Sequence, residues 1–104
     1  MKYRFTETGD QQAENEDAWW RGNRDKAPDL FNRELEQVLE TLLVLPESGK
    51  LYGVHDGVQL RRVPLKKTRC HVYYSVDTNA DEIVVHFVWG SRLRGGPPLT
   101  GGGH

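Results

Sequence analysis

The chain has 104 residues, a length typical of one compact domain. Its net charge of −1 hides an asymmetry, because residues 1–47 carry 11 acidic and 6 basic side chains whereas residues 48–104 carry 4 acidic and 8 basic ones. This distribution excludes a uniformly basic nucleic-acid-binding protein and predicts one anionic and one cationic surface for partners.

The single cysteine, Cys70, excludes an intrachain disulfide and a thiolate metal cluster. No apolar run approaches the roughly 18–20 residues that cross a bilayer, and no charged-then-apolar leader precedes the first strand. We therefore expect a soluble cytoplasmic protein without membrane contact. His71 and His86 have no acidic residues nearby at suitable ligand spacing, so we expect no metal site, and we expect no cofactor.

The N-terminal third of the chain predicts a strand followed by a helix. Residues 2–6 alternate the apolar side chains of Tyr3 and Phe5 with polar ones, as in a short half-buried strand. Residues 10–25 are rich in Gln, Ala and Glu, which favours a helix that weakens at Gly22.

A second helix is indicated much more clearly. Pro28 suits a first helical turn, and Pro46 ends the pattern. Between them, apolar residues recur at spacings of 4, 3, 4 and 3, which is one stripe of an amphipathic helix. The stripe consists of Phe31, Leu35, Val38, Leu42 and Leu45.

Three strands are predicted in the C-terminal half. Residues 58–65 form the first, with Pro64 marking an edge or a bulge because proline cannot donate to a ladder. Residues 69–77 form the second strand, with side chains that alternate cleanly between the two faces. Residues 82–89 are apolar on both faces apart from His86, as expected of a central strand covered on both sides.

The predicted fold is therefore α+β, in the order β-α-α-β-β-β, with a helical hairpin packed on one face of an antiparallel sheet. We expect a single domain over residues 1–96 and a flexible Gly/Pro-rich tail over residues 97–104. The Gly-Gly-Gly-His end of that tail has the composition of a cloning remnant.

Basic side chains gather around the last strands, where they could converge on one anionic surface. The alternative is that they form a solvated edge and a solvated hairpin loop. The candidates for contact with a target or partner are Arg61, Arg62, Lys66, Lys67, Arg69, Arg92 and Arg94.

Two histidines are candidates for proton transfer, because histidine titrates near neutrality. His71 shares one strand face with Tyr73, opposite Val72 and Tyr74, and Tyr73 could stack on a base or a partner side chain. His86 lies within an apolar strand, which is more typical of a hydrogen-bonded core histidine.

Two adjacent tryptophans lie in the first predicted helix. Consecutive helical positions diverge by about 100°, so Trp19 and Trp20 rarely both bury against one sheet. We expect Trp20 to be exposed and to belong to a partner contact.

Several short motifs occur in a characteristic order along the chain. They are Ala18-Trp19, the helix series Phe31, Leu35, Leu42, Leu45-Pro46 and Gly49, then Val58-Gln-Leu-Arg61-Arg62, His71-Val-Tyr-Tyr74-Ser-Val-Asp77, and Ile83-Val-Val-His-Phe-Val-Trp89-Gly-Ser-Arg92. In this order and spacing the chain resembles the RelE/ParE superfamily of type II toxin–antitoxin toxins.

That resemblance implies one of two activities. RelE-like toxins are ribosome-dependent endoribonucleases that cut mRNA, whereas ParE-like toxins inhibit DNA gyrase without breaking RNA. Arg62 and Arg92 match two RelE-type positions, but Pro64 and His71 replace the expected Lys and Arg, and no Tyr follows in the C-terminal segment. We therefore favour gyrase inhibition. If the protein is instead an mRNA endoribonuclease, Arg62, His71 and Arg92 are its catalytic candidates.

The resemblance also implies a cognate antitoxin whose C-terminal segment wraps the toxin. A homodimer and a heterotetramer with the antitoxin are both compatible with the sequence, and so is an inactive or differently targeted relative. A DNA-binding repressor role is disfavoured, because no segment has the pattern of a recognition helix.

Overall fold

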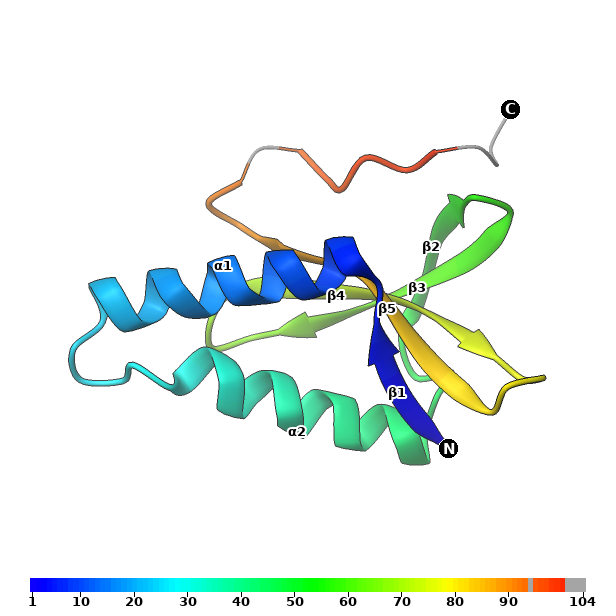
Figure 1. Cartoon of the computed structure of the whole chain (residues 1–104), viewed down its shortest axis with the longest axis horizontal. Coiled ribbons are helices and arrows are strands. Elements are labelled where there is room, and N and C mark those ends of the chain that lie inside the picture. Colours follow the sequence, from blue (N-terminus) through cyan, green and yellow to red (C-terminus); the bar gives the residue numbers. More distant parts are fainter. Residues whose placement is uncertain (94, 101–104) are drawn as a thin grey trace.

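The computed structural model describes residues 1–93 and 95–100 (Figure 1). Two helices and five strands follow one another in the order β-α-α-β-β-β-β. They are β1 (Lys2–Phe5), α1 (Glu7–Asn23), α2 (Leu30–Val44), β2 (Lys50–His55), β3 (Val58–Leu65), β4 (Cys70–Asp77) and β5 (Glu82–Gly90). No helix in the described part of the chain is long and apolar enough to span a membrane.

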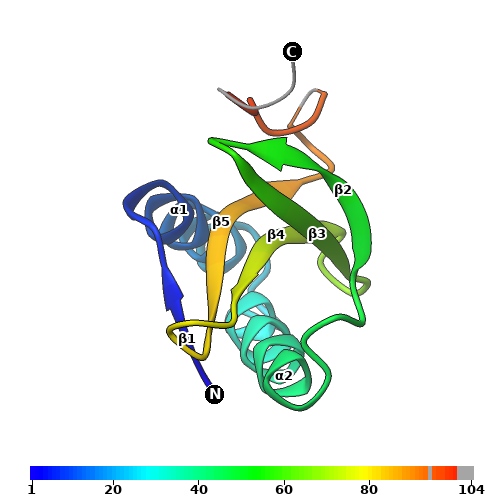
Figure 2. The same ribbon diagram turned by 90° about the vertical axis from the view of Figure 1, so that its right-hand side faces the viewer.

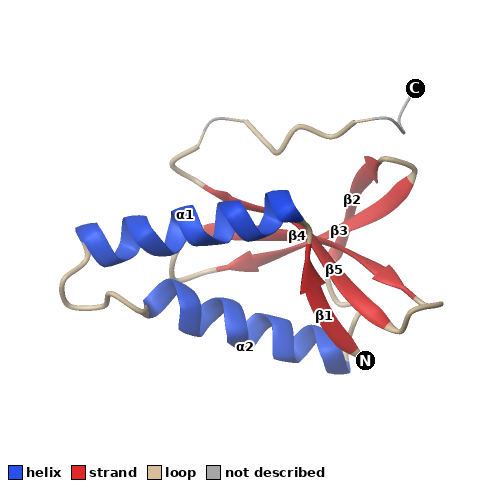
Figure 3. Cartoon of the chain, viewed as in Figure 1, coloured by secondary structure: helices blue, strands red, loops and turns tan. Residues whose placement is uncertain are grey.

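The five strands form one sheet in the order β1-β5-β4-β3-β2 (Figures 2 and 3). The α+β class and the helical hairpin on one face are confirmed. The sheet differs from the prediction in two ways: it is mixed, because β1 pairs in parallel with β5, and it contains the additional strand β2. The pairing of β2 with β3 slips between Leu51 and Gly53, so β2 lacks the regular alternation that would have revealed it.

Pro64 lies where its missing N–H does little harm. Pro64 is paired with His71 of β4, while the pairing of β3 with β2 ends at Arg62. Pro64 is therefore at a locally free edge of β3, in agreement with the predicted edge position.

The first helix begins three residues earlier than predicted, and its cap and a glycine explain why. The Thr6 hydroxyl accepts a hydrogen bond from the Gly9 N–H at 3.0 Å, which caps the helix N-terminus. A Cβ atom at Gly9 would lie 2.6 Å from the Val85 carbonyl oxygen. The first turn of α1 therefore rests directly on β5, as only glycine allows.

The second helix buries three of the five residues of the predicted stripe, Phe31, Leu35 and Leu42, and Val38 is partly buried. Leu39, which was not in the stripe, is also buried. Leu45, the last member of the predicted stripe, is 58% exposed because the helix ends at Val44 and the chain turns away.

The sheet has a helix-covered face and an opposite face, which we call the helix face and the open face. The helix-face core contains α2 residues together with alternate strand residues. Its strand members are Leu65, Cys70, Val72, Tyr74, Ile83, Val85 and Val88. A smaller apolar cluster of Leu60, Tyr73 and Phe87 lies on the open face.

The C-terminal segment, residues 95–100, partly covers the open face. Leu99 packs against the open-face cluster, and Pro97 is buried. The segment is anchored at both ends, because the Trp89 indole N–H donates to the Gly95 carbonyl at 3.0 Å and the Thr100 N–H donates to His55 Nδ1 at 3.0 Å. Residues 97–100 of the predicted flexible tail thus pack on the sheet, and residues 101–104 lie outside the described residues.

Candidate functional site

A hollow of about 400 Å³ lies between the open face of the sheet and the start of the C-terminal segment. We call it the open-face hollow. Strand register builds it, because Arg62 of β3 is opposite Tyr73 of β4, and His71 of β4 is opposite Trp89 of β5. Its lining residues are Tyr52, Arg62, His71, Tyr73, Trp89, Gly90, Ser91, Leu93, Gly95 and Gly96.

Arg62 supplies the positive charge of the open-face hollow. Its guanidinium carbon lies 5.2 Å from the centre of the Tyr52 ring, within cation–π distance of the aromatic face. None of the ion pairs among the described residues involves Arg62. Its charge is therefore not neutralised by a carboxylate of the described residues and can attract an anionic ligand.

His71 and Tyr73 supply groups that can exchange or donate a proton. Burial lowers the pKa of His71, and the nearby Arg62 charge lowers it further, so the imidazole is neutral at pH 7 and can accept a proton. Burial raises the pKa of Tyr73, whose hydroxyl therefore keeps its proton. The two rings are 6.3 Å apart. The predicted placement of His71 and Tyr73 on one strand face is confirmed.

Arg61 points to the other side of the sheet. It donates hydrogen bonds to the carbonyl oxygens of Glu47 at 3.0 Å and Gly49 at 2.8 Å. Its contacts therefore fix the loop between α2 and β2, and Arg61 takes no part in the open-face hollow.

Arg92, the other strong candidate, also lies outside this hollow. Its guanidinium group pairs with the carboxylate of Glu16 in α1, at 2.8 Å and 3.3 Å, and its carbon lies 4.9 Å from the Trp19 ring. Glu16 is buried. The adjacent Cys70 thiol stays protonated, because burial, with the Glu16 charge, raises the pKa of Cys70 to about 12.

A second hollow, of about 380 Å³, lies beside α1 and contains most of the remaining predicted cations. We call it the helix-side hollow. It lies at the same end of the sheet as the open-face hollow, but on the helix face, so the predicted cations divide between two surfaces. Its lining residues are Glu16, Trp19, Trp20, Arg24, Lys67, Thr68, Arg69, Ser91 and Arg92.

The remaining candidates are placed as follows. Lys66 is exposed in the turn between β3 and β4. Trp20 was expected to be exposed, but it is half-buried and packs against the helix-face core while lining the helix-side hollow. Arg94 lies outside the described residues. The functional roles of all these residues remain predictions.

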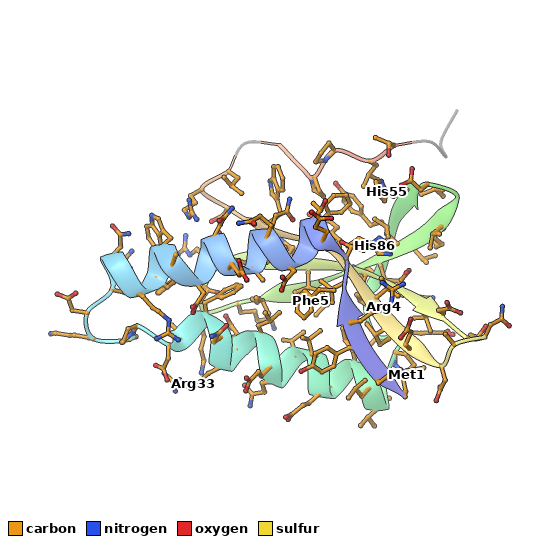
Figure 4. The ribbon with its side chains drawn as sticks, viewed as in Figure 1. Met1, Arg4, Phe5, Arg33, His55 and His86 are labelled. Atoms are coloured by element: carbon orange, nitrogen blue, oxygen red, sulfur yellow. The ribbon has the colours of Figure 1, made fainter. Side chains whose placement is uncertain are left out.

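A histidine pair on the open face was not anticipated (Figure 4). The His86 Nε2 atom lies 2.8 Å from the Ser75 hydroxyl, and the rings of His86 and His55 are 5.9 Å apart. His86 is thus a hydrogen-bonded, half-buried histidine, the more ordinary of its two predicted states. His55 and Tyr52 were missed because both lie in β2, which the sequence pattern did not indicate.

A pair of helices on one face of a five-stranded mixed sheet is the α+β architecture of a RelE-type fold. The solved structure of the isolated RelE toxin of Escherichia coli is similar, with a TM-score of 0.54 over 88% of this chain and 86% of that one, at 19% sequence identity. This likeness establishes the fold. No protein-family model matches the sequence, and no curated protein matches it.

Proposed function

We propose that this protein is the toxin component of a type II toxin–antitoxin system and that the open-face hollow is its site of action. The RelE-type fold supports the class of protein. The single observation that carries the site is the juxtaposition, in one hollow, of a guanidinium group outside the ion pairs of the described residues, a neutral imidazole and two phenol rings.

These groups support cleavage of RNA more directly than binding alone. Cleavage begins when the 2′-hydroxyl loses its proton and attacks the adjacent phosphorus, and the 5′ oxygen then leaves with a proton. His71, neutral at pH 7, would take the first proton, and Arg62 would stabilise the additional charge on the phosphorus oxygens. The Tyr52 hydroxyl, partly exposed in the hollow, is the candidate donor to the leaving oxygen.

Cutting of a defined mRNA on translating ribosomes tests this activity. We expect His71→Gln and Arg62→Gln each to slow cutting by about 10²-fold or more, the usual contribution of a positioned acid, base or charge. Arg33→Gln is the matched control, because Arg33 is exposed on α2 and pairs with Asp29, away from the hollow. Equal cutting by His71→Gln and the wild type would contradict the assignment.

Inhibition of DNA gyrase is the second candidate, and two observations favour it. Arg92 is held by Glu16 instead of facing the open-face hollow, and no tyrosine follows Tyr74 in the sequence. The same preparation should therefore be added to a gyrase supercoiling assay. Loss of supercoiling with intact mRNA would assign gyrase as the target and exclude RNA cleavage as the activity.

The broader proposal, that the protein is a toxin, is tested by induced expression in bacteria. We expect growth arrest that is relieved by co-expression of the antitoxin from a neighbouring reading frame and by the Arg62→Gln substitution. Continued growth with abundant folded wild-type protein would contradict the toxin assignment whichever target is involved.

A further inference from the structure

The helix-side hollow is a second cationic surface for which the proposed activity gives no use. Four basic side chains line it against one carboxylate, Glu16, which is already paired with Arg92. The other three basic residues, Arg24, Lys67 and Arg69, form none of the ion pairs found among the described residues. The basic side chains that line the hollow therefore outnumber its one lining carboxylate, and three of them are outside the ion pairs of the described residues.

The aromatic wall of this hollow orients the guanidinium groups. The Arg24 guanidinium carbon lies 5.5 Å from the Trp19 ring and 5.6 Å from the Trp20 ring, while Arg92 approaches Trp19 at 4.9 Å. A guanidinium group stacked on an indole presents its N–H edge sideways, the geometry that grips a phosphate or carboxylate in a bidentate manner.

The opposite wall is held rigidly. The Glu34 carboxylate of α2 accepts hydrogen bonds from the backbone N–H groups of Lys67 at 2.7 Å and Thr68 at 3.0 Å, and from the Thr68 hydroxyl at 2.7 Å. Arg69 then adopts φ +59°, a left-handed conformation unusual for a residue with a side chain. The Lys67 and Arg69 side chains are thus presented from a fixed turn.

The two hollows are contiguous. Ser91 lines both of them, and the residues that precede it, Trp89 and Gly90, pair with His71 and Cys70 at the same end of the sheet. A flexible polyanion seated in the open-face hollow can therefore continue past Ser91 into the helix-side hollow.

We propose that the helix-side hollow binds the phosphodiester backbone of single-stranded RNA that flanks the segment held in the open-face hollow. This inference rests on the proposed RNA-cleaving function. Single-stranded RNA carries one charge per nucleotide along a flexible chain, which fits two cationic hollows that share one lining residue, Ser91. An acidic protein segment would satisfy the helix-side hollow alone and would not require its continuity with the open-face hollow.

Fluorescence anisotropy with uncleavable 2′-O-methyl RNA of three and nine nucleotides tests the inference. We expect the double variant Arg24→Gln/Arg69→Gln to bind the nine-nucleotide RNA about tenfold or more weakly and the three-nucleotide RNA as tightly as the wild type. The slope of log affinity against log salt should fall by about 1.4 for the longer RNA, because two phosphate contacts are lost. The control Lys2→Gln/Arg33→Gln removes the same charge from exposed sites elsewhere and should bind both RNAs normally.

An equal loss of affinity for both RNAs, or no loss for either, would overturn the inference. So would a hexaglutamate peptide whose binding requires Arg24 and Arg69 while RNA binding does not, since the hollow would then serve a protein partner. The binding test does not depend on cleavage, so failure of one proposal can be distinguished from failure of the other. Length-dependent binding without cutting on ribosomes would remove only the proposed activity, whereas cutting without length dependence would remove only the flanking site.

Discussion

Tyr74 shows how one side chain ties the sheet to the loop that leaves α2. Its hydroxyl donates to the Pro46 carbonyl at 2.7 Å and accepts from the Gly49 N–H at 2.9 Å, in a fully buried position. A Cβ atom at Gly49 would lie 2.6 Å from that hydroxyl. The loop therefore passes so close to the Tyr74 hydroxyl at this position that only glycine fits.

Tyr74→Phe should destabilise the fold by about 1–3 kcal/mol, because the Gly49 N–H and the Pro46 carbonyl lose their partner in a buried place. Urea unfolding followed by tryptophan fluorescence measures the change. Tyr3→Phe is the control, since Tyr3 is exposed and should shift stability by less than about 0.5 kcal/mol. A Tyr74→Phe protein as stable as the control would show that the hydroxyl makes no net contribution to the free energy of unfolding.

Glu16 and Arg92 form an ion pair whose carboxylate end is buried and whose guanidinium end is half exposed. Arg92→Ala should cost about 2–4 kcal/mol, because it leaves the Glu16 charge without its partner. The double variant Glu16→Gln/Arg92→Ala should regain part of that loss in the same urea experiment. If the double variant is less stable than Arg92→Ala, the pair is not what holds Glu16 in place.

This ion pair also affects how toxicity data must be interpreted. An Arg92→Ala protein that no longer arrests growth has lost either a target contact or stability, and growth alone does not separate the two. Arg62 is the more informative position, since its side chain lies in the open-face hollow and forms no ion pair within the described residues. Measurements of folded protein should accompany either variant.

At the scale of elements, the turn between β3 and β4 depends on a residue of α2. Glu34→Ala removes three hydrogen bonds to Lys67 and Thr68 and should cost about 2–3 kcal/mol. Amide hydrogen exchange at Lys67 and Thr68 should accelerate more than exchange in β4. The control is Glu36→Ala, which removes an exposed carboxylate from the same helix. Unchanged exchange at both amides would refute the role of Glu34.

The elements that could be predicted are those whose pattern is local. The stripe from Phe31 to Leu42 defined α2, and the alternation in β4 placed His71 and Tyr73 on one face, as the structure has them. The sequence pattern missed β2, where the pairing slips beside Gly53. It misplaced the start of α1 because a helix-weakening glycine, Gly9, serves there as a contact with β5.

The candidate site could likewise be predicted only in part. Arg62 and His71 are brought together by strand register, which follows from local pattern once the strands are known. Arg92 is held by Glu16, which is 76 residues away in the chain. α1 has several acidic residues, and nothing in the sequence singles out Glu16 among them as the partner. Alternation tells which face a side chain occupies, but the partner it meets depends on how helix and sheet pack.

At the scale of the whole molecule, the charge asymmetry of the sequence becomes a spatial polarity. A groove between β1 and the two helices is lined by the acidic side chains of Asp10, Glu14, Asp17 and Glu36. The basic side chains of both hollows gather at the other end of the sheet, where β4 begins and β5 ends. The acidic groove shares no lining residue with either basic hollow, so the predicted separation of charge is present. The single cationic surface predicted for the C-terminal half is instead divided between two hollows, and Arg24 of the helix-side hollow belongs to the N-terminal half.

The stability of the whole domain should depend on pH through its half-buried histidines, His86 and His71. Burial lowers the pKa of His86, and the neighbouring His55 and Arg4 lower it further, outweighing the opposing charge of Asp56. Burial and Arg62 lower the pKa of His71 in the same direction. In the unfolded chain both imidazoles titrate near their ordinary pKa of about 6.5. Between the folded and unfolded pKa values, the unfolded state therefore binds more protons.

It follows that the free energy of unfolding should be nearly constant between about pH 7.5 and pH 8 and should fall as the pH drops through about 6.5. Urea unfolding at intervals from pH 8 to pH 5.5 measures this slope above the range in which most carboxylates titrate. His86→Gln keeps a side chain that can bond to the Ser75 hydroxyl but removes one titrating group, so its curve should be flatter than that of the wild type even if its absolute stability is lower. A His86→Gln/His71→Gln protein that loses stability as steeply as the wild type over this range would show that other groups carry the pH dependence.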